Sequence, residues 1–281
     1  MEQRLKIGLG TVQFGLKYGI SNTTGQTAAS EVTKILNYAT SEGISILDTA
    51  FGYGESEAVL GQNALQHFKI VSKFLPPSDS LSIEEQFTES CTRLGVKQLY
   101  GYLAHRPTAV FENPEQWEVL KKLKAKGRVS KIGFSFNTPE EVDRAIETGM
   151  IPDLVQVPYN YLDRRFETKI KVLKEQYACE IHTRSVFMQG LFFTPTASLP
   201  GFFDPIKELL NDFKKHYPNT AGSLLQFALV KSFIDCVVIG VNEVNQLQDN
   251  IASLENAVVP IGTDLPAIPE VIVQPSNWPQ L

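Results

Sequence analysis

The sequence predicts an α/β fold, namely a (β/α)8 TIM barrel in which parallel strands are surrounded by outer helices. Short apolar runs alternate along the chain with longer amphipathic ones, which is the pattern of βα units around a parallel sheet. The length of 281 residues suits such a barrel, which typically needs about 250 residues. No interdomain linker or low-complexity segment interrupts the pattern. We therefore expect a single domain over residues 1–281, with a proline-rich C-terminal tail at 257–281.

Eight short apolar runs are expected to be the strands of this barrel. Most of them leave room for a helix before the next run, as βα units require. The eight runs are Lys6–Leu9, Ile44–Asp48, Ile70–Phe74, Leu99–Leu103, Lys131–Ser135, Leu154–Val157, Glu180–Thr183 and Cys236–Ile239.

Helices are expected in the intervals between these runs. Apolar residues at helical spacing predict a helix over 27–42, with Thr27 as its N-terminal cap and Gly43 as its stop. Thr138 followed by Pro139 predicts the start of another helix, because a threonine oxygen can accept from free amides and proline fits the first turn.

Extra chain lies between the seventh run and the helix expected at 221–232. It covers residues 190–219 and contains a further helix expected at 204–217. Long loops on a barrel usually shape its site, so we expect this segment to lie near the functional residues.

The composition excludes several classes of function. With 43% hydrophobic and 20% charged residues the chain resembles soluble globular proteins, and no stretch approaches the roughly 20 apolar residues that cross a bilayer. The formal net charge of -5 offers no basic surface for nucleic acid. Cys91, Cys179 and Cys236 are widely separated, and the N-terminus lacks the apolar core of a signal peptide. We expect a cytoplasmic protein with small-molecule partners.

Ionisable residues stand at the polar ends of three consecutive apolar runs. Asp48 ends one run and Tyr53 follows it in a short glycine-flanked loop, while Lys73 and His105 end the next two runs. The reacting groups of a (β/α)8 barrel project from these strand ends. Each residue alone has an ordinary explanation, such as a helix cap, a packed tyrosine, a solvated strand end or a loop imidazole. Their joint occurrence favours catalysis.

In this order and context the four residues resemble the catalytic tetrad of the aldo-keto reductases, and the similarity continues through most of the chain. The segment Gln156–Asn160 is similar to uncharacterised bacterial members found among sugar and surface-polysaccharide genes. The resemblance implies an NAD(P)H-dependent oxidoreductase that reduces an aldehyde or ketone to an alcohol. Sugar-like compounds are among the candidate substrates.

The chemistry expected of the four groups is the delivery of a proton to a carbonyl oxygen. Tyr53 is the natural acid, and the ammonium of Lys73 would stabilise its phenolate. Asp48 would hold that ammonium by a charge-assisted hydrogen bond, while a neutral His105 would orient the substrate oxygen. The hydride must come from a cofactor, because no protein side chain supplies one.

The expected cofactor is a nicotinamide dinucleotide, although no glycine-rich fingerprint opens a helix in this sequence. A barrel offers another phosphate site, at the helix N-terminus after its last strands. The resemblance implies the following cofactor-binding residues: Gly10, Thr11, Asp48, Ser135, Gln156, Arg184, Ser185, Gly240, Val241, Asn242, Glu243, Gln246, Asp249 and Asn250. Each of them could instead make ordinary strand-end hydrogen bonds.

Three departures from the family pattern concern this cofactor. Phe136 stands where an asparagine is common, and Arg184 replaces an aromatic residue that often stacks on the nicotinamide. Uncharged Gly240 and Gln246 replace the basic residues that often grip the 2′-phosphate of NADP, and Glu243 lies nearby. A carboxylate would repel a phosphate but could accept from the ribose hydroxyls of NAD. Both NADP(H) and NAD(H) therefore remain open.

The substrate pocket is expected to have a mostly apolar wall. Its candidate rim residues are Phe14, Tyr18, Phe51, Phe74, Tyr159 and Phe187, of which Phe14 and Phe51, with Arg106, are the candidate substrate contacts. Arg106 and Arg184 could recognise an anionic or sugar-like substrate, but structural arginines are as common. The physiological substrate, the reaction direction and the oligomeric state are left undecided. The tail either folds over the mouth of the barrel or covers its outer face.

Two other classes of function were weighed. The same fold could bind the cofactor as a sensor or regulatory subunit without turnover, but the intact tetrad argues against this. A metal-dependent barrel hydrolase would need several histidines and carboxylates around an ion, whereas only His105 stands at a suitable strand end. No metal site is expected.

Overall fold

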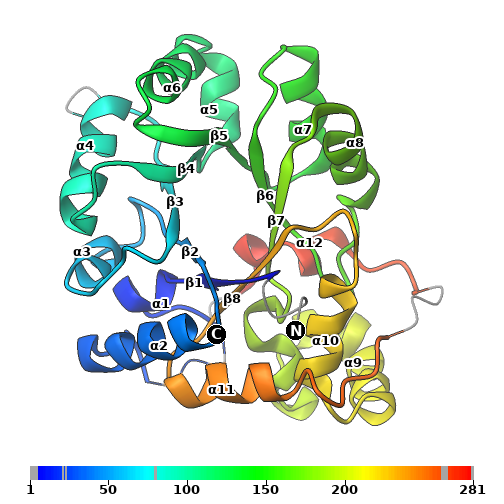
Figure 1. The fold of residues 1–281 in the computed structure, drawn as a ribbon. Helices are drawn as coiled ribbons and strands as arrows, with labels where there is room; N and C mark the ends of the chain where they lie inside the picture. Colours follow the sequence, from blue (N-terminus) through cyan, green and yellow to red (C-terminus); the bar gives the residue numbers. More distant parts are fainter. Residues whose placement is uncertain (1–5, 21, 23, 79–80, 261–264, 280–281) are drawn as a thin grey trace.

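The computed structural model describes residues 6–20, 22, 24–78, 81–260 and 265–279. Eight parallel strands pair in sequence order within this part of the chain, and the last pairs with the first to close a barrel (Figure 1). The expected (β/α)8 architecture is therefore confirmed. The strands are β1 Ile7–Gly10, β2 Ile46–Asp48, β3 Lys69–Phe74, β4 Leu99–Ala104, β5 Val129–Ser135, β6 Leu154–Pro158, β7 Glu180–Arg184 and β8 Cys236–Gly240.

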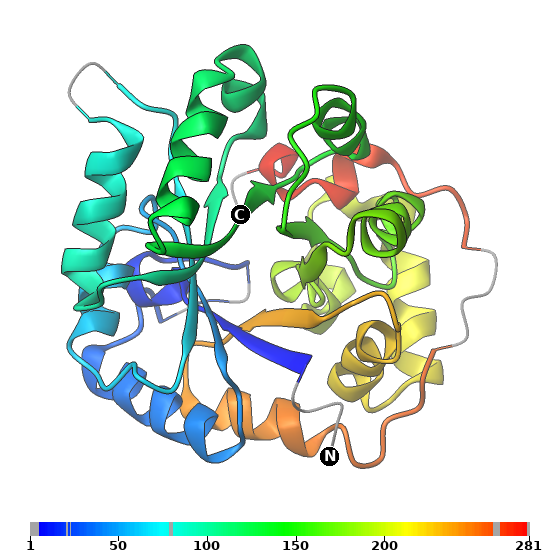
Figure 2. The same ribbon diagram turned by 45° about the horizontal axis from the view of Figure 1, so that its top comes forward.

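Helices surround the strands on the outside of the barrel (Figures 1 and 2). The α-helices are α1 Val12–Gly15, α2 Ala29–Ser41, α3 Ser56–Gly61, α4 Ile83–Leu94, α5 Pro107–Glu112, α6 Glu115–Ala125, α7 Pro139–Glu147, α8 Glu167–Tyr177, α9 Asp204–His216, α10 Thr220–Leu229, α11 Val244–Ala252 and α12 Glu270–Val273. Short 3-10 turns cover Met188–Phe193, Thr196–Ser198, Gly201–Phe203 and Pro275–Asn277. No helix in the described ranges is both long and apolar enough to span a membrane.

Two helix boundaries differ from the sequence prediction. Thr27 does not cap α2, because the helix begins two residues later and Ala28 occupies the N-cap position. The Thr27 hydroxyl instead donates to the carbonyl oxygen of Asn242 at 3.3 Å, which ties the start of α2 to the loop after β8. Helix α10 ends at Leu229 rather than at residue 232, since the chain must turn to enter β8 at Cys236.

The main hydrophobic core lies between the barrel and its helices, and smaller clusters complete it. Val71, Leu103 and Leu154 form one small cluster, and a second one contains Cys236 and Val238. Branched apolar side chains typically fill the interior of such barrels in layers. A rigid frame of this kind fixes the side chains at the strand ends.

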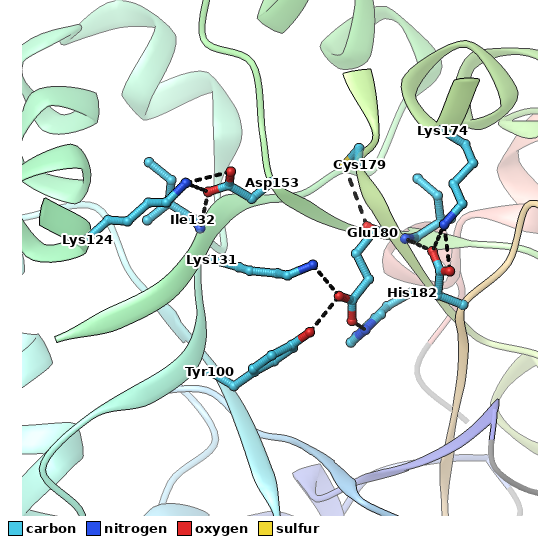
Figure 3. Close-up of polar contacts among 11 residues, drawn as sticks. Tyr100, Lys124, Lys131, Ile132, Asp153, Lys174, Cys179, Glu180 and His182 are labelled. Atoms are coloured by element: carbon cyan, nitrogen blue, oxygen red, sulfur yellow. Dashed lines mark hydrogen bonds and ion pairs between the residues drawn. The ribbon is translucent and has the colours of Figure 1, made fainter. Parts of the chain in front are cut away.

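The amino ends of the strands are closed by a polar cluster (Figure 3). The Glu180 carboxylate accepts from the Tyr100 hydroxyl at 2.6 Å and from the Lys131 ammonium, and it lies 2.7 Å from Nε2 of the buried His182. Burial opposes the charged form of Glu180, but the hydrogen bonds from His182, Lys131 and Tyr100 lower its pKa. This network leaves the opposite end of the barrel as the open one.

Candidate active site

A cavity of about 960 Å³ opens at the carboxyl ends of the strands. This volume lies within the range of about 300–1,000 Å³ that small-molecule and cofactor sites occupy. Strand-end residues of the barrel, the β7 loop and the C-terminal segment form its wall. It is the end of the barrel at which the sequence predicts the reacting groups.

The ends of β2 and β3 bring a buried ion pair into the floor of this site. Lys73 Nζ donates to both carboxylate oxygens of Asp48, at 2.8 and 2.7 Å, and to the carbonyl oxygen of Thr49 at 3.0 Å. The Lys73 side chain is 0% exposed and that of Asp48 is 5% exposed. Burial is the largest single influence and disfavours the ammonium, but Asp48 and Tyr53 together outweigh it, so the pKa of Lys73 is raised. Lys73 is therefore charged at neutral pH.

The fourth partner of this ammonium is the Tyr53 hydroxyl, whose oxygen lies 3.4 Å from Lys73 Nζ. Tyr53 stands in the loop between β2 and α3, and α1 packs directly on this loop. A Cβ atom added at Gly15 in α1 would overlap the carbonyl oxygen of Tyr53, so only glycine permits this approach. The Ser56 hydroxyl also donates to the Thr11 carbonyl oxygen at 2.8 Å, which anchors the far end of the loop to the region after β1. The phenol is held in place from two sides.

His105 follows β4 and faces the same phenol. The rings of Tyr53 and His105 meet edge to face, with centroids 5.6 Å apart. Burial lowers the pKa of His105 to about 3, and the positive charges of Lys73, Arg106 and Arg184 act in the same direction. The imidazole is therefore neutral at physiological pH. Its Nδ1 is buried without a hydrogen-bond partner among the described residues.

The structure thus brings Asp48, Tyr53, Lys73 and His105 together as the sequence predicts. Gln156 joins them from β6, because its amide nitrogen donates to Asp48 Oδ1 at 2.7 Å. The sequence analysis assigns this amide to the cofactor, whereas here its nitrogen supports the carboxylate. A phenol beside an ammonium and a neutral imidazole can donate a proton to an oxygen placed between them.

Most of the residues that the resemblance assigns to the cofactor line the cavity. They are Gly10, Thr11, Asp48, Ser135, Gln156, Arg184, Ser185, Gly240, Asn242, Gln246, Asp249 and Asn250. Val241 does not, because its side chain belongs to the hydrophobic core, and Glu243 is the exposed N-cap residue of α11. These residues come from the carboxyl ends of six strands and from α11, so together they could hold an elongated cofactor.

Phe136 does not take the place of the missing asparagine. Its ring is fully buried and stacks on Phe134, with centroids 5.2 Å apart. Asn137, one residue further, lines the cavity and accepts from Arg184 Nη2 at 2.9 Å through Oδ1. Asn137 could have been predicted from strand alternation, because side chains two residues apart point to the same face and Ser135 faces the cavity.

The expected aromatic wall is wrong in part. Tyr18 and Phe187 line the cavity, with Phe193 beside them, but four other expected rings do not. Phe14 and Phe74 are buried in the hydrophobic core, Phe51 packs under the guanidinium of Arg93, and Tyr159 stacks on Phe227. These rings face the helices rather than the cavity, so Phe14 and Phe51 do not contact a molecule bound there. Arg106 does line it.

Tail residues 265–279, which include the red helix α12 of Figure 1, reach the mouth of the barrel. The Arg165 guanidinium donates to Glu270 at 2.8 Å, and the Trp278 indole donates to the Ile272 carbonyl oxygen at 2.8 Å while its ring packs on Phe203. The tail residues that line the cavity are Val273, Gln274, Pro275 and Ser276. The sequence alone allows either this position or one on the outer face of the barrel.

The described residues contain no group of three or more His, Cys, Asp and Glu side chains arranged to hold a metal ion. Gln13, Arg165 and Gln189 also line the cavity. The sequence favours a solvated charge cluster for Asp163, Arg164 and Arg165, but Asp163 is buried and Arg165 lines the cavity. The backbone of Gln189 lies in the left-handed region, with φ of 53°. Because few non-glycine residues adopt this conformation, the periodicity of the sequence does not predict the direction of its side chain.

Comparisons with known proteins agree with this geometry. The model of the aldo/keto reductase family matches residues 6–261. The uncharacterized oxidoreductase YqkF of Bacillus subtilis is 24% identical over 276 residues, which cover 88% of this chain and 86% of that protein. The aldo-keto reductase YhdN of Bacillus subtilis is 26% identical over 181 residues, 59% of this chain and 53% of that protein. The oxidoreductase sirO of Leptosphaeria maculans is 28% identical over 168 residues, 56% and 51% respectively. The chain thus spans about half the length of the last two relatives.

Solved structures show the same fold. The aldo-keto reductase AKR11C1 from Bacillus halodurans, in its holo form, superposes with a TM-score of 0.71 at 20% identity, covering 91% of this chain and 88% of that one. An aldo/keto reductase from Klebsiella pneumoniae in complex with NADP and acetate gives 0.66 at 21% identity, covering 92% and 87%. Because the family match runs over residues 6–261, from the first strand of the barrel past α11, the chain belongs to the aldo/keto reductase family of oxidoreductases.

Proposed function

We propose that the protein reduces an aldehyde or ketone to an alcohol in this cavity, with hydride from a nicotinamide cofactor and a proton from Tyr53. The observation that carries the proposal is the charged Lys73 ammonium, 3.4 Å from the Tyr53 oxygen and fixed by Asp48. When bound, the cofactor supplies the hydride that no side chain can supply.

Each of the four residues has a distinct part in the proton transfer. Tyr53 donates its proton to the carbonyl oxygen, and the neighbouring Lys73 ammonium stabilises the phenolate that remains. Asp48, itself held by Gln156, keeps the ammonium beside the phenol. His105 is neutral, so it can donate one hydrogen bond to the same oxygen and orient it without competing as an acid.

We further propose that the cofactor lies along the wall from β1 to β8 and that NADH is preferred over NADPH. By the family resemblance the adenosine end belongs at the start of α11. The Glu31 carboxylate already accepts from the Val244 amide there, at 2.8 Å, and Asp249 lines the adjoining cavity. Arg106, Arg165 and Arg184 are the only cations among the lining residues, and they stand on other loops. The Glu31 carboxylate is offset by the Lys34 ammonium at 2.9 Å, so a second phosphate would mainly meet the Asp249 carboxylate here.

The test is NADH-dependent reduction of a panel of aldehydes and ketones by the wild type, Tyr53→Phe and Tyr18→Phe. Loss of a catalytic proton donor should lower kcat about 100- to 10,000-fold in Tyr53→Phe, with the Kd for NADH unchanged. Tyr18→Phe is the matched control, since it removes another cavity hydroxyl, which accepts a hydrogen bond from Gln189 Nε2 at 3.0 Å. Loss of that neutral bond should cost about tenfold at most.

Two outcomes would contradict the proposal. Equal turnover by the wild type and Tyr53→Phe would show that another group donates the proton. Cofactor binding without turnover of any compound in the panel would support a sensor or regulatory subunit on the same fold instead.

A further inference from the structure

We propose that the carbonyl substrate carries an anionic group, a carboxylate or a phosphate, and that the Arg106 guanidinium binds it. This inference rests on the proposed function, because it names the substrate class of the same cavity. Its basis is the position of Arg106, its lack of a partner and the charge balance of the cavity wall.

Arg106 stands on the substrate side of the cavity. It directly follows His105 at the end of β4 and lines the cavity with an exposed side chain. In a closed barrel with strands in sequence order, β4 lies four strands away from β8 in either direction (Figure 1). The proposed cofactor phosphates lie at the start of α11, directly after β8. A guanidinium on the opposite side is therefore free to meet the other molecule of the reaction.

The Arg106 guanidinium has no hydrogen bond or ion pair with another of the described residues. Arg165, by contrast, pairs with Asp163 and Glu270 at 2.9 and 2.8 Å. A structural arginine would be expected to hold a carbonyl or carboxylate in this way. Arg106 instead presents an unused planar donor group, which matches the two oxygens of a carboxylate or a phosphate.

The charges around the tetrad leave the cavity wall positive on this side. The Asp48 carboxylate is neutralised by Lys73, and the Arg184 guanidinium hydrogen-bonds only neutral oxygens, those of Phe136 and Asn137. Arg106 and Arg184 both contribute to the electrostatic field at His105. The whole chain has a formal net charge of -5, so the positive charge on this side of the cavity contrasts with the negative charge of the protein. A cleft of one sign attracts ligands of the other sign.

The experiment compares matched pairs of aldehydes with the cofactor-loaded protein. 4-Carboxybenzaldehyde is paired with its neutral methyl ester, and glyceraldehyde 3-phosphate with glyceraldehyde. We expect kcat/KM to favour the charged member of at least one pair in the wild type. In Arg106→Met that preference should fall about 10- to 100-fold, the effect of losing a charge-assisted hydrogen bond. The pair that changes more identifies the anionic group.

The control is Arg144→Met, which removes an exposed guanidinium on α7 that packs on Phe111 and does not line the cavity. Its charged-to-neutral preference should equal that of the wild type. Arg106→Lys keeps the charge without the planar donor pair, so it should fall between the wild type and Arg106→Met.

A binding measurement gives the same comparison without turnover. Calorimetric titration of the NADH-loaded protein with 4-(hydroxymethyl)benzoate, the alcohol product, should give a Kd about 10- to 100-fold higher for Arg106→Met than for the wild type. Reduction of the neutral aldehydes, with no preference for the charged ones, would overturn this inference and leave the proposed function intact. Failure to reduce any aldehyde would overturn both.

Discussion

Replacement of Asp48 by asparagine tests the central ion pair most severely. The substitution keeps the size of the side chain but leaves the Lys73 ammonium 0% exposed and without its counter-ion. The remaining partners of Nζ are the Thr49 carbonyl oxygen and the Tyr53 hydroxyl. A buried charge that loses its partner retains its full desolvation cost.

The expected loss of stability is large. Breaking a buried ion pair from one side costs about 3–5 kcal/mol. For domains of this size class each kcal/mol shifts Tm by roughly 2–4 °C, so Tm should fall by roughly 6–20 °C at pH 7. Turnover should fall as well, because the ammonium is no longer held beside the Tyr53 oxygen.

The stability deficit should shrink as the pH rises. In the wild type the pKa of Lys73 is raised, so its contribution is fully present below the unfolded pKa of about 10.4 and is lost as pH rises through the folded value. In Asp48→Asn the contributions of the carboxylate are gone, so burial, the largest influence and one that lowers the pKa of Lys73, is opposed only by Tyr53. The folded variant then sheds a proton more readily than its unfolded state, and its stability increases with pH.

The assay is thermal unfolding of the wild type, Asp48→Asn and Asp143→Asn, monitored by circular dichroism at pH 7 and pH 9.5. Asp143 pairs with Lys169 at 2.6 Å, but the two side chains are 42% and 35% exposed. This control should therefore lie within about 1 kcal/mol of the wild type. An Asp48→Asn protein as stable as the control, or a deficit that does not shrink at pH 9.5, would refute the reasoning.

The remaining predictions concern two other carboxylates. Burial raises the pKa of Glu57, so its stabilisation is lost as pH rises above the unfolded value of about 4.3. The Tm of Glu57→Gln relative to the wild type should rise as pH increases from about 4.3, until Glu57 is ionised in the folded protein, and a constant Tm difference would contradict this. Glu31→Gln removes a negative charge at the start of α11, so NADPH should bind better relative to NADH. In fluorescence titrations the ratio of the Kd for NADPH to the Kd for NADH should fall by up to about fivefold.

The strands and the four tetrad positions could be predicted because the information is local. A short apolar run ending on a polar residue marks both a buried strand and its carboxyl end, and all such ends meet at one side of a parallel barrel. Asp48 and Lys73 lie 25 residues apart, yet the closed barrel makes them neighbours at 2.7 Å. The topology supplies the contact once the strands are correctly placed.

The aromatic wall was predicted less well because the residue type of an aromatic side chain does not indicate whether it faces the cavity or the helices. Phe74 follows Lys73 by one residue and therefore faces outward, where it packs on Tyr102 with centroids 5.3 Å apart. Alternation gives this answer for residues within a strand. Phe14 and Phe51 lie outside the strands, so their directions depend on tertiary packing.

The position of the tail depends on contacts between distant parts of the chain. Glu270 meets Arg165, 105 residues earlier, and the Trp278 ring packs on Phe203. No periodic pattern near the tail indicates such partners. The same reason explains Thr27, whose hydroxyl reaches the Asn242 carbonyl oxygen rather than the start of its own helix.

The most direct test of the account is a fluorescence titration of the purified wild-type protein with NADH and, separately, with NADPH. Cofactor binding needs no knowledge of the substrate, and the proposed function cannot operate without it. We expect saturable binding of both nucleotides, with the lower Kd for NADH because the Asp249 carboxylate opposes a second phosphate. Tighter binding of NADPH would contradict the proposed preference, and binding of neither nucleotide would contradict the central claim.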